Sequence, residues 1–125
     1  KIIIKLIKLL KRLGSHETNL IVAIGPTISS KKYTLNKDLF DLFNKSMNSN
    51  YPHFYYLQQK NIVSVNNKNN IELDLKLYAF HQLLKENIHY ENIDISNKCT
   101  YLSNDEFYSF RKTKTEQRQW SFISN

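Results

Sequence analysis

Hydrophobic positions near the start of the chain recur at helical spacing. Ile2, Leu6 and Leu9 fall on one side of a helical projection, and lysines fill the opposite side. Gly14 follows, and glycine readily adopts the left-handed conformation that ends a helix. The pattern therefore predicts a helix over residues 1–13 that stops at Gly14.

Two further helices and a buried strand are predicted downstream. The apolar run from Leu20 to Ile24 is uninterrupted, which is typical of a strand buried on both faces, and Gly25-Pro26 ends it. Helical spacing recurs over residues 36–47 and 72–88. The side chains expected to face inward are Leu39, Phe40, Leu42, Phe43 and Met47 in the first helix, and Leu73, Leu77, Phe80, Leu84 and Ile88 in the second.

Shorter segments complete the pattern. Residues 62–65 are compatible with a short strand, and the run of Asn and Lys at 66–70 indicates a turn. Residues 93–95 alternate as an edge strand does, and residues 118–123 predict a closing strand. In that closing strand Trp120 and Phe122 share one face, and Ser121 and Ile123 share the other. Strands alternating with helices indicate an α/β fold in one domain.

Composition supports a packed domain in a reducing compartment. Of the 125 residues, 41% are hydrophobic and 13% aromatic, which excludes wholesale disorder. Cys99 is the only cysteine, so no internal disulfide forms. Residues 1–13 carry five basic side chains and no small-residue cleavage site, so we expect neither a membrane span nor a signal peptide there. We therefore expect a cytoplasmic protein.

The positive charge is concentrated in the first third of the chain. The net charge is +7; residues 1–37 hold eight basic side chains against one acidic, and the rest of the chain is balanced. One hypothesis is a small module that binds RNA, DNA or an anionic membrane through the helix of residues 1–13. A solvated charged face over an apolar core face is the commoner explanation, so we expect neither nucleic acid nor membrane as a partner.

Cys99 and the histidines offer little catalytic chemistry. The thiol of Cys99 would need a neighbouring base and a lowered pKa to act as a nucleophile, and a buried small residue in a Cys-Thr turn is the simpler interpretation. The histidines are His16, His53, His81 and His89, and their spacing matches no zinc motif. We predict no catalytic residue and no metal ligand among these side chains.

Four segments, in this order and spacing, carry a family resemblance: Gly25-Pro26-Thr27-Ile28, Cys99-Thr100, Phe107-Tyr108-Ser109-Phe110-Arg111-Lys112, and Arg118-Gln119-Trp120-Ser121-Phe122-Ile123. They resemble the C-terminal part of the laccase-domain, or multicopper polyphenol oxidase, family. Its pattern there reads G-P-x-I, a D-L helix carrying Q-L, C-T, F-F-S-Y-R-R and G-R-x-x-S-x-I. Tyr33 also matches, whereas Gln117 stands where the family has Gly.

The resemblance implies a fold, a reaction and its cofactors. Complete members form a layered α/β sandwich with a mixed sheet, of which residues 1–125 would supply the C-terminal half. Members resemble purine nucleoside phosphorylases with adenosine deaminase activity, acting on adenosine, inosine or guanosine with phosphate. The implied cofactor is zinc, with copper as the alternative metal. The family's metal ligands lie in upstream motifs, so this chain would hold no metal and be inactive alone.

Two arginines are candidates for binding substrate or phosphate. Arg111 lies among aromatic residues that can orient it, and a guanidinium suits bidentate contact with phosphate or carboxylate. Arg118 is the second candidate. The alternative for Arg111 is a structural pair with a carboxylate at the edge of the core.

The predicted first helix has a clear stop but no N-cap, so we expect a fragment. Its partner would be the missing N-terminal half, if that half is separately encoded. A degenerate, non-catalytic remnant is the alternative. Either way, half of a layered domain would leave apolar surface and strand edges uncovered.

Overall fold

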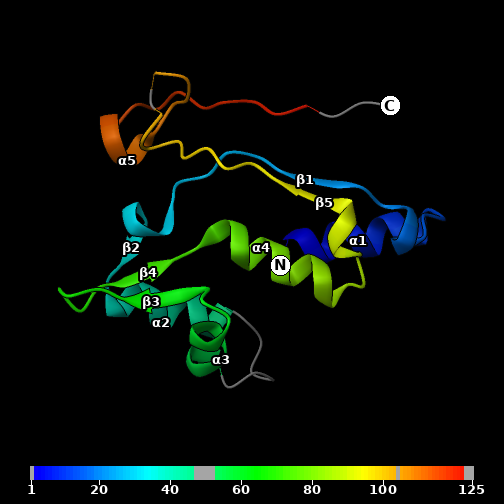
Figure 1. Cartoon of the computed structure of the whole chain (residues 1–125), viewed down its shortest axis with the longest axis horizontal. Coiled ribbons are helices and arrows are strands. Elements are labelled where there is room, and N and C mark those ends of the chain that lie inside the picture. Colours follow the sequence, from blue (N-terminus) through cyan, green and yellow to red (C-terminus); the bar gives the residue numbers. More distant parts are fainter. Residues whose placement is uncertain (1, 47–52, 104, 123–125) are drawn as a thin grey trace.

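A computed structural model describes residues 2–46, 53–103 and 105–122, except for the side chains of residues 43–46 and 53–55. The chain alternates helices with short strands (Figure 1). The helices are α1 Ile2–Arg12, α2 Lys37–Ser46, α3 His53–Gln59, α4 Leu75–Lys85 and α5 Phe110–Thr113, with 3-10 turns η1 Glu17–Asn19, η2 Ser30–Lys32 and η3 Tyr90–Asn92. The strands are β1 Val22–Ile24, β2 Thr34–Leu35, β3 Val63–Val65, β4 Ile71–Leu73 and β5 Ile93–Ile95.

One half of the molecule is a parallel strand pair packed on two helices. β1 pairs with β5 in the register Val22 to Ile93 and Ile24 to Ile95. Helices α1 and α4 lie together on one side of this pair, and the C-terminal segment runs along the other (Figure 1). Its core is formed by the buried side chains of Ile7, Leu83, Ile88 and Ile93.

The other half is an antiparallel sheet in the order β2-β4-β3, with α2 and α3 beneath it (Figure 1). Its core contains Leu35, Phe40, Leu57, Ile62, Val63, Ile71 and Leu73. Parallel and antiparallel pairing thus both occur, in two separate sheets of the described chain. The α/β class predicted from the sequence is confirmed.

Local signals at two turns are confirmed. Gly14 adopts the left-handed conformation, with φ of 95°, directly after α1. The side-chain oxygen of Asn66 accepts hydrogen bonds from the backbone amides of Lys68 and Asn70, at 3.0 and 3.1 Å. Asn69 takes a positive φ of 57°, which asparagine tolerates well. This turn joins β3 to β4 as a hairpin.

The helix predicted over 72–88 is wrong at its start. Residues 71–73 form β4, which pairs with both β2 and β3. The carboxylate of Asp74 then accepts a hydrogen bond from the amide of Leu77 at 2.9 Å and caps α4. Apolar residues at 71 and 73 fit a strand and a helix equally well. The neighbouring strands and the Asp74 cap decide in favour of the strand.

The strand at 20–24 is shorter and less buried than predicted. It begins at Val22, and only one face is covered, by α1 and α4. Ile21 is 78% exposed and Ala23 is also exposed. The expectation of burial on both faces is therefore wrong, because the C-terminal segment that runs along the second side leaves Ala23 exposed.

The closing strand predicted at 118–123 is also wrong for residues 118–122, and Ile123 lies outside the described residues. These residues belong to no sheet, and Trp120 and Phe122 are 82% and 88% exposed. A strand requires a neighbouring strand to satisfy its backbone groups, and the described chain supplies none here.

Helix α2 buries less than its pattern predicts. Phe40 is in the core, but Leu39 and Leu42 are exposed. The predicted inward positions Phe43 and Met47, and the break at 48–52, fall on side chains or residues that are not described. Helix α3, for which the sequence pattern gave no prediction, packs Leu57 into the same core.

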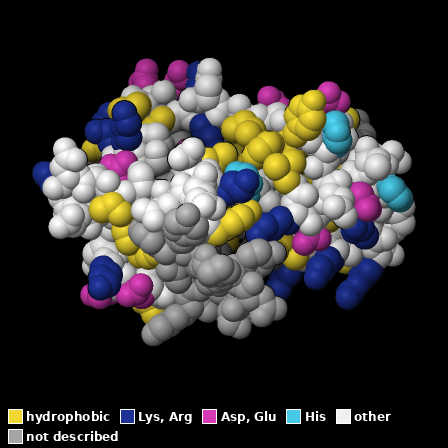
Figure 2. Space-filling view, turned by 60° about the horizontal axis from the view of Figure 1, so that its bottom comes forward, with side chains coloured by type: hydrophobic (Ala, Val, Ile, Leu, Met, Phe, Trp, Pro, Cys, Tyr) yellow, Lys and Arg dark blue, Asp and Glu magenta, His cyan; other side chains and the backbone are white. Residues whose placement is uncertain are grey.

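Hydrophobic side chains reach the surface in patches between Lys and Arg side chains (Figure 2). The large hydrophobic side chains that are exposed include Ile2, Leu6, Leu9 and Leu13 of α1, Ile21 just before β1, and Trp120 and Phe122 of the C-terminal segment. In the part of the chain that the structure describes, no helix has the length and apolarity to cross a bilayer.

Candidate functional site

Three segments distant in the sequence converge at one end of the parallel strand pair. Thr27 forms a parallel bridge with Cys99, where the amide of Thr100 donates to the carbonyl of Thr27 at 3.1 Å. Helix α5 lies beside this turn and beside η2 (Figure 1). The Gly-Pro segment, the Cys-Thr turn and the aromatic-arginine segment of the sequence are thereby brought together.

Arg111 projects from α5 onto the segment that joins η2 to β2. Its Cζ lies 5.1 Å from the centroid of the Tyr33 ring, and its Nη1 donates to the carbonyl of Thr34 at 3.4 Å. No carboxylate forms an ion pair with Arg111 among the described residues. The alternative role as a structural partner of an acidic side chain therefore has no support in the described chain. The guanidinium is oriented, exposed and able to bind an anion.

Arg118 is placed differently from Arg111. Its Nη1 donates to the carbonyls of Thr115 and Gln117 at 3.1 and 2.8 Å, and its Cζ lies 5.8 Å from the centroid of the Phe110 ring. These contacts tie the guanidinium to its own segment. Both arginines lie near α5, but only Arg111 reaches across to another part of the fold.

The ring of Tyr101, near α5, is contacted by two further cationic side chains. The ammonium groups of Lys32 and Lys112 lie 5.4 and 5.6 Å from the centroid of the Tyr101 ring. Attraction between a cation and a ring face fixes such side chains weakly, by roughly 0.5–1 kcal/mol at an exposed site. With Arg111 they give this end of the molecule a positive surface, which we call the basic cluster: Lys32, Arg111 and Lys112.

Cys99 lies in the turn that also contains Tyr101, and it is 9% exposed. The amide of Ser29 donates to its Sγ at 3.2 Å, and the Ser29 hydroxyl lies 3.3 Å from the same atom. Burial raises the pKa of the Cys99 thiol. Hydrogen bonds from the hydroxyl and amide of Ser29, and from the amides of Leu102 and Tyr101, outweigh burial and lower that pKa to about 7.

The sequence predicted a buried residue in a Cys-Thr turn, and that placement is confirmed. The lowered pKa of the Cys99 thiol was not predicted, because Ser29 lies 70 residues away in the sequence and no local motif indicates the contact. The basic cluster was missed in part for the same reason. Only the Arg111 segment carried a signal in the sequence.

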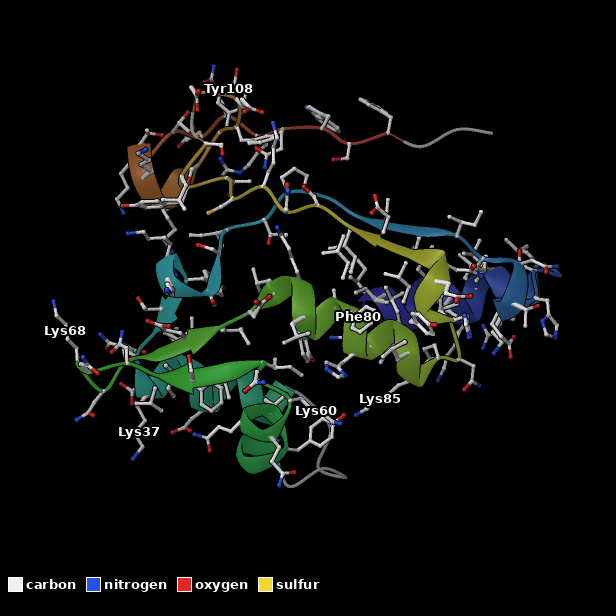
Figure 3. The ribbon with its side chains drawn as sticks, viewed as in Figure 1. Lys37, Lys60, Lys68, Phe80, Lys85 and Tyr108 are labelled. Carbon is white, nitrogen blue, oxygen red and sulfur yellow. The ribbon has the colours of Figure 1, made fainter. Side chains whose placement is uncertain are left out.

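The histidines whose side chains are described, His16, His81 and His89, are engaged in separate local interactions. His16 caps η1 through a contact with Thr18, and His89 pairs with Glu91 at 3.5 Å on the surface. Burial, then the charges of Lys60 and Lys85, lowers the pKa of His81. Figure 3 shows these two lysines far from Tyr108, which lies beside α5. The described residues contain no group of three His, Cys, Asp or Glu side chains that could hold a metal ion.

Comparison with known proteins agrees with this architecture. The family model described as "Multi-copper polyphenol oxidoreductase laccase" matches residues 1–125. Comparison with curated proteins gives no significant match.

Two solved structures are similar to the chain. The Bacillus licheniformis hypothetical protein YfiH superimposes with a TM-score of 0.71 and 22% identity, over 90% of this chain and 40% of that one. YlmD from Geobacillus stearothermophilus has a TM-score of 0.56 and 25% identity, over 74% of this chain and 31% of that one. The chain thus spans less than half the length of these relatives, and the first of them shows the same α/β fold. Because the family model matches the whole length, this chain belongs to the multi-copper polyphenol oxidoreductase laccase family.

Proposed function

We propose that this chain is the C-terminal part of an enzyme that cleaves purine nucleosides with phosphate and deaminates adenosine. The resemblance of its motifs to that branch of the family and the family membership support this proposal. Its substrates would be adenosine, inosine or guanosine together with inorganic phosphate. Arg111 would contact the phosphate, and Arg118 is the weaker candidate for the same task.

The single observation that carries the proposal is the state of Arg111. Its guanidinium is held by Tyr33 and the carbonyl of Thr34, is exposed, and has no carboxylate partner among the described residues. In phosphorolysis a phosphate oxygen attacks C1′ of the nucleoside while the purine departs. An oriented guanidinium can hold the other phosphate oxygens by two parallel hydrogen bonds and so align the attack.

The metal that the family resemblance implies does not fit the described residues of this chain. The described side chains form no group of three possible ligands, and Cys99 is engaged by Ser29. Zinc, or copper in its place, would therefore have to be held by residues outside the described ones.

Phosphate binding by the chain tests the role of Arg111. Inorganic phosphate is titrated into the ¹⁵N-labelled protein, and the amides of 33–35 and 110–113 are followed by NMR. We expect Arg111→Gln to weaken binding roughly tenfold or more, because a hydrogen bond to a charged group contributes about 1.5–3 kcal/mol. Arg118→Gln, at the weaker candidate, should reduce binding clearly less than Arg111→Gln. Equal loss in both variants would contradict the assignment.

Activity is tested in a chimera in which this chain replaces the matching 40% of Bacillus licheniformis YfiH. Release of hypoxanthine from inosine and phosphate is measured beside deamination of adenosine. If neither YfiH nor the chimera acts on these nucleosides, the proposed reaction is wrong.

A non-catalytic remnant is the second candidate, and one observation favours it. No metal-holding group exists among the described residues. Zinc-dependent phosphorolysis by the purified 125-residue chain alone would exclude this candidate, whereas activity of the chimera alone would leave the chain a competent part of an enzyme.

A further inference from the structure

Strand β1 has a partner on only one of its two edges. It pairs with β5, and no other described strand adjoins it. The carbonyl of Ile24 accepts a hydrogen bond from the amide of Ser96 at 2.9 Å, so the backbone groups of Ile24 face β5. The backbone groups of successive residues point to opposite edges of a strand. The backbone groups of Ala23, which lies next to Ile24 in the strand, therefore face the open edge.

A groove of about 540 Å³ runs along this open edge. Its walls come from four parts of the chain, which are α1, β1 with its flanking residues, α4 and the C-terminal segment. The principal lining side chains are Ile3, Leu6 and Leu10 of α1, Ile21 and Ala23 at β1, and Phe122. The C-terminal segment closes over the far end, where the hydroxyl oxygen of Ser121 lies 3.8 Å from the position of a Cβ on Gly25.

Helix α1 extends this apolar surface beyond the groove. Its buried side faces α4 and β1 through Ile7. Its next apolar stripe is exposed and consists of Ile2, Leu6, Leu9 and Leu13. An apolar stripe of this width is typical of a helix covered on two sides. The described chain covers it on one side only.

The groove suits an extended peptide better than a small molecule. Small-molecule sites place several convergent polar side chains among apolar ones. Here the lining side chains are apolar except for Ser121. The available polar groups are instead those of the strand edge, which favour the addition of another strand. In such addition the main chain supplies the hydrogen bonds and alternate side chains fill the apolar groove.

We propose that the open edge of β1 binds a β-strand from the complementary part of the same domain, which the solved relatives possess and this sequence does not include. This chain covers 40% of YfiH and 31% of YlmD, so both relatives contain further polypeptide that could supply such a strand. Every second side chain of the added strand is apolar and packs on Leu6 and Leu10. The inference rests on family membership and on the groove, and not on the proposed reaction.

Co-expression tests this directly. The tagged chain is co-expressed with the part of Bacillus licheniformis YfiH that lies outside its match, and the complex is purified without nucleoside, phosphate or zinc. We expect an equimolar complex in which the amide of Ala23 gains protection from hydrogen exchange. The amide of Ile24, which already faces β5, should change less.

A matched pair of proline variants locates the strand. Ala23→Pro removes the donor at the open edge of β1, whereas Ile95→Pro removes the equivalent outward donor on β5. Ala23→Pro should weaken the complex by about tenfold or more, and Ile95→Pro should leave it intact. Because Ala23→Pro could unfold β1, Leu6→Glu in the groove wall is tested beside Leu42→Glu on α2, and only the former should weaken binding.

Each other outcome overturns the proposal. Loss of the complex in Ile95→Pro but not in Ala23→Pro would move the added strand to β5. If neither proline variant nor Leu6→Glu weakens the complex, the added segment does not bind in this groove. If no complex forms, the complementary part of the domain does not bind at the open edge of β1. A self-associated chain that Ala23→Pro converts to monomer would assign the groove to a second copy. None of these results depends on whether purine nucleosides are substrates.

Discussion

The guanidinium of Arg111 lies over the ring of Tyr33, with 5.1 Å between Cζ and the ring centroid. This contact joins α5 to the segment between η2 and β2, and the hydrogen bond from Arg111 to Thr34 spans 77 positions of the sequence. The cation therefore has a defined direction although it is exposed. That direction is the property that an anion-binding arginine needs.

Removing the Tyr33 ring should leave the guanidinium of Arg111 less well oriented. We expect Tyr33→Ala to weaken binding of inorganic phosphate by a factor of about 2–5, since a cation over an aromatic ring is held by roughly 0.5–1 kcal/mol at an exposed site. The affinity is measured by NMR titration. Tyr33→Phe keeps the ring and serves as the control, so a loss of equal size in that variant would argue for the hydroxyl instead.

The core under the antiparallel sheet depends on Leu73, which is 1% exposed. Leu73→Ala should lower the free energy of unfolding by about 3 kcal/mol, because it removes buried methyl groups and leaves a cavity. Leu42→Ala, at a position that is 63% exposed, should change it by less than about 0.5 kcal/mol. Urea unfolding followed by circular dichroism compares the two. Similar losses would mean that Leu42 is buried in solution.

The start of α4 depends on the carboxylate of Asp74, which accepts from the amide of Leu77 at 2.9 Å. Asp74→Ala should destabilise the protein by about 1 kcal/mol, because an N-terminal amide of the helix loses its acceptor. Asp74→Ser restores an acceptor and should recover most of that loss in the same unfolding experiment. If serine is as harmful as alanine, the cap is not the reason that the helix begins here.

Ionisation of Cys99 should make stability depend on pH. The thiol pKa is about 7 in the folded protein and about 8.5 in an unfolded chain. Between these values unfolding takes up a proton, so the free energy of unfolding should rise as pH increases through this window. The contribution is lost when pH falls through about 7.

The difference in unfolding free energy between the protein and Cys99→Ser, measured across this pH range, isolates the effect. Ser29→Ala removes the hydroxyl that hydrogen bonds to Sγ and should raise the pKa of Cys99. The pH range over which stability changes should then become narrower. A difference that stays flat with pH would contradict the lowered pKa.

Much of the local structure could be predicted from the sequence. The first helix and its stop at Gly14, the turn at 66–70 and the strand at 93–95 follow from spacing and from residues with strong conformational preferences. Arg111 could be singled out because aromatic residues flank it. These signals act over a few residues, so they are visible without a fold.

Other features of the molecule depend on contacts between segments that are distant in the sequence, and only the tertiary structure shows them. Neighbouring strands made residues 71–73 a strand and not the start of a helix, and the absence of a strand partner left the described residues 118–122 outside any sheet. Ser29 set the ionisation of Cys99, and Tyr33 set the direction of Arg111. The sequence by itself determined the α/β class and the family motifs, because periodicity and short patterns encode them. Burial, pKa and the open edge of β1 depend on which elements lie side by side, and only the folded chain settles that.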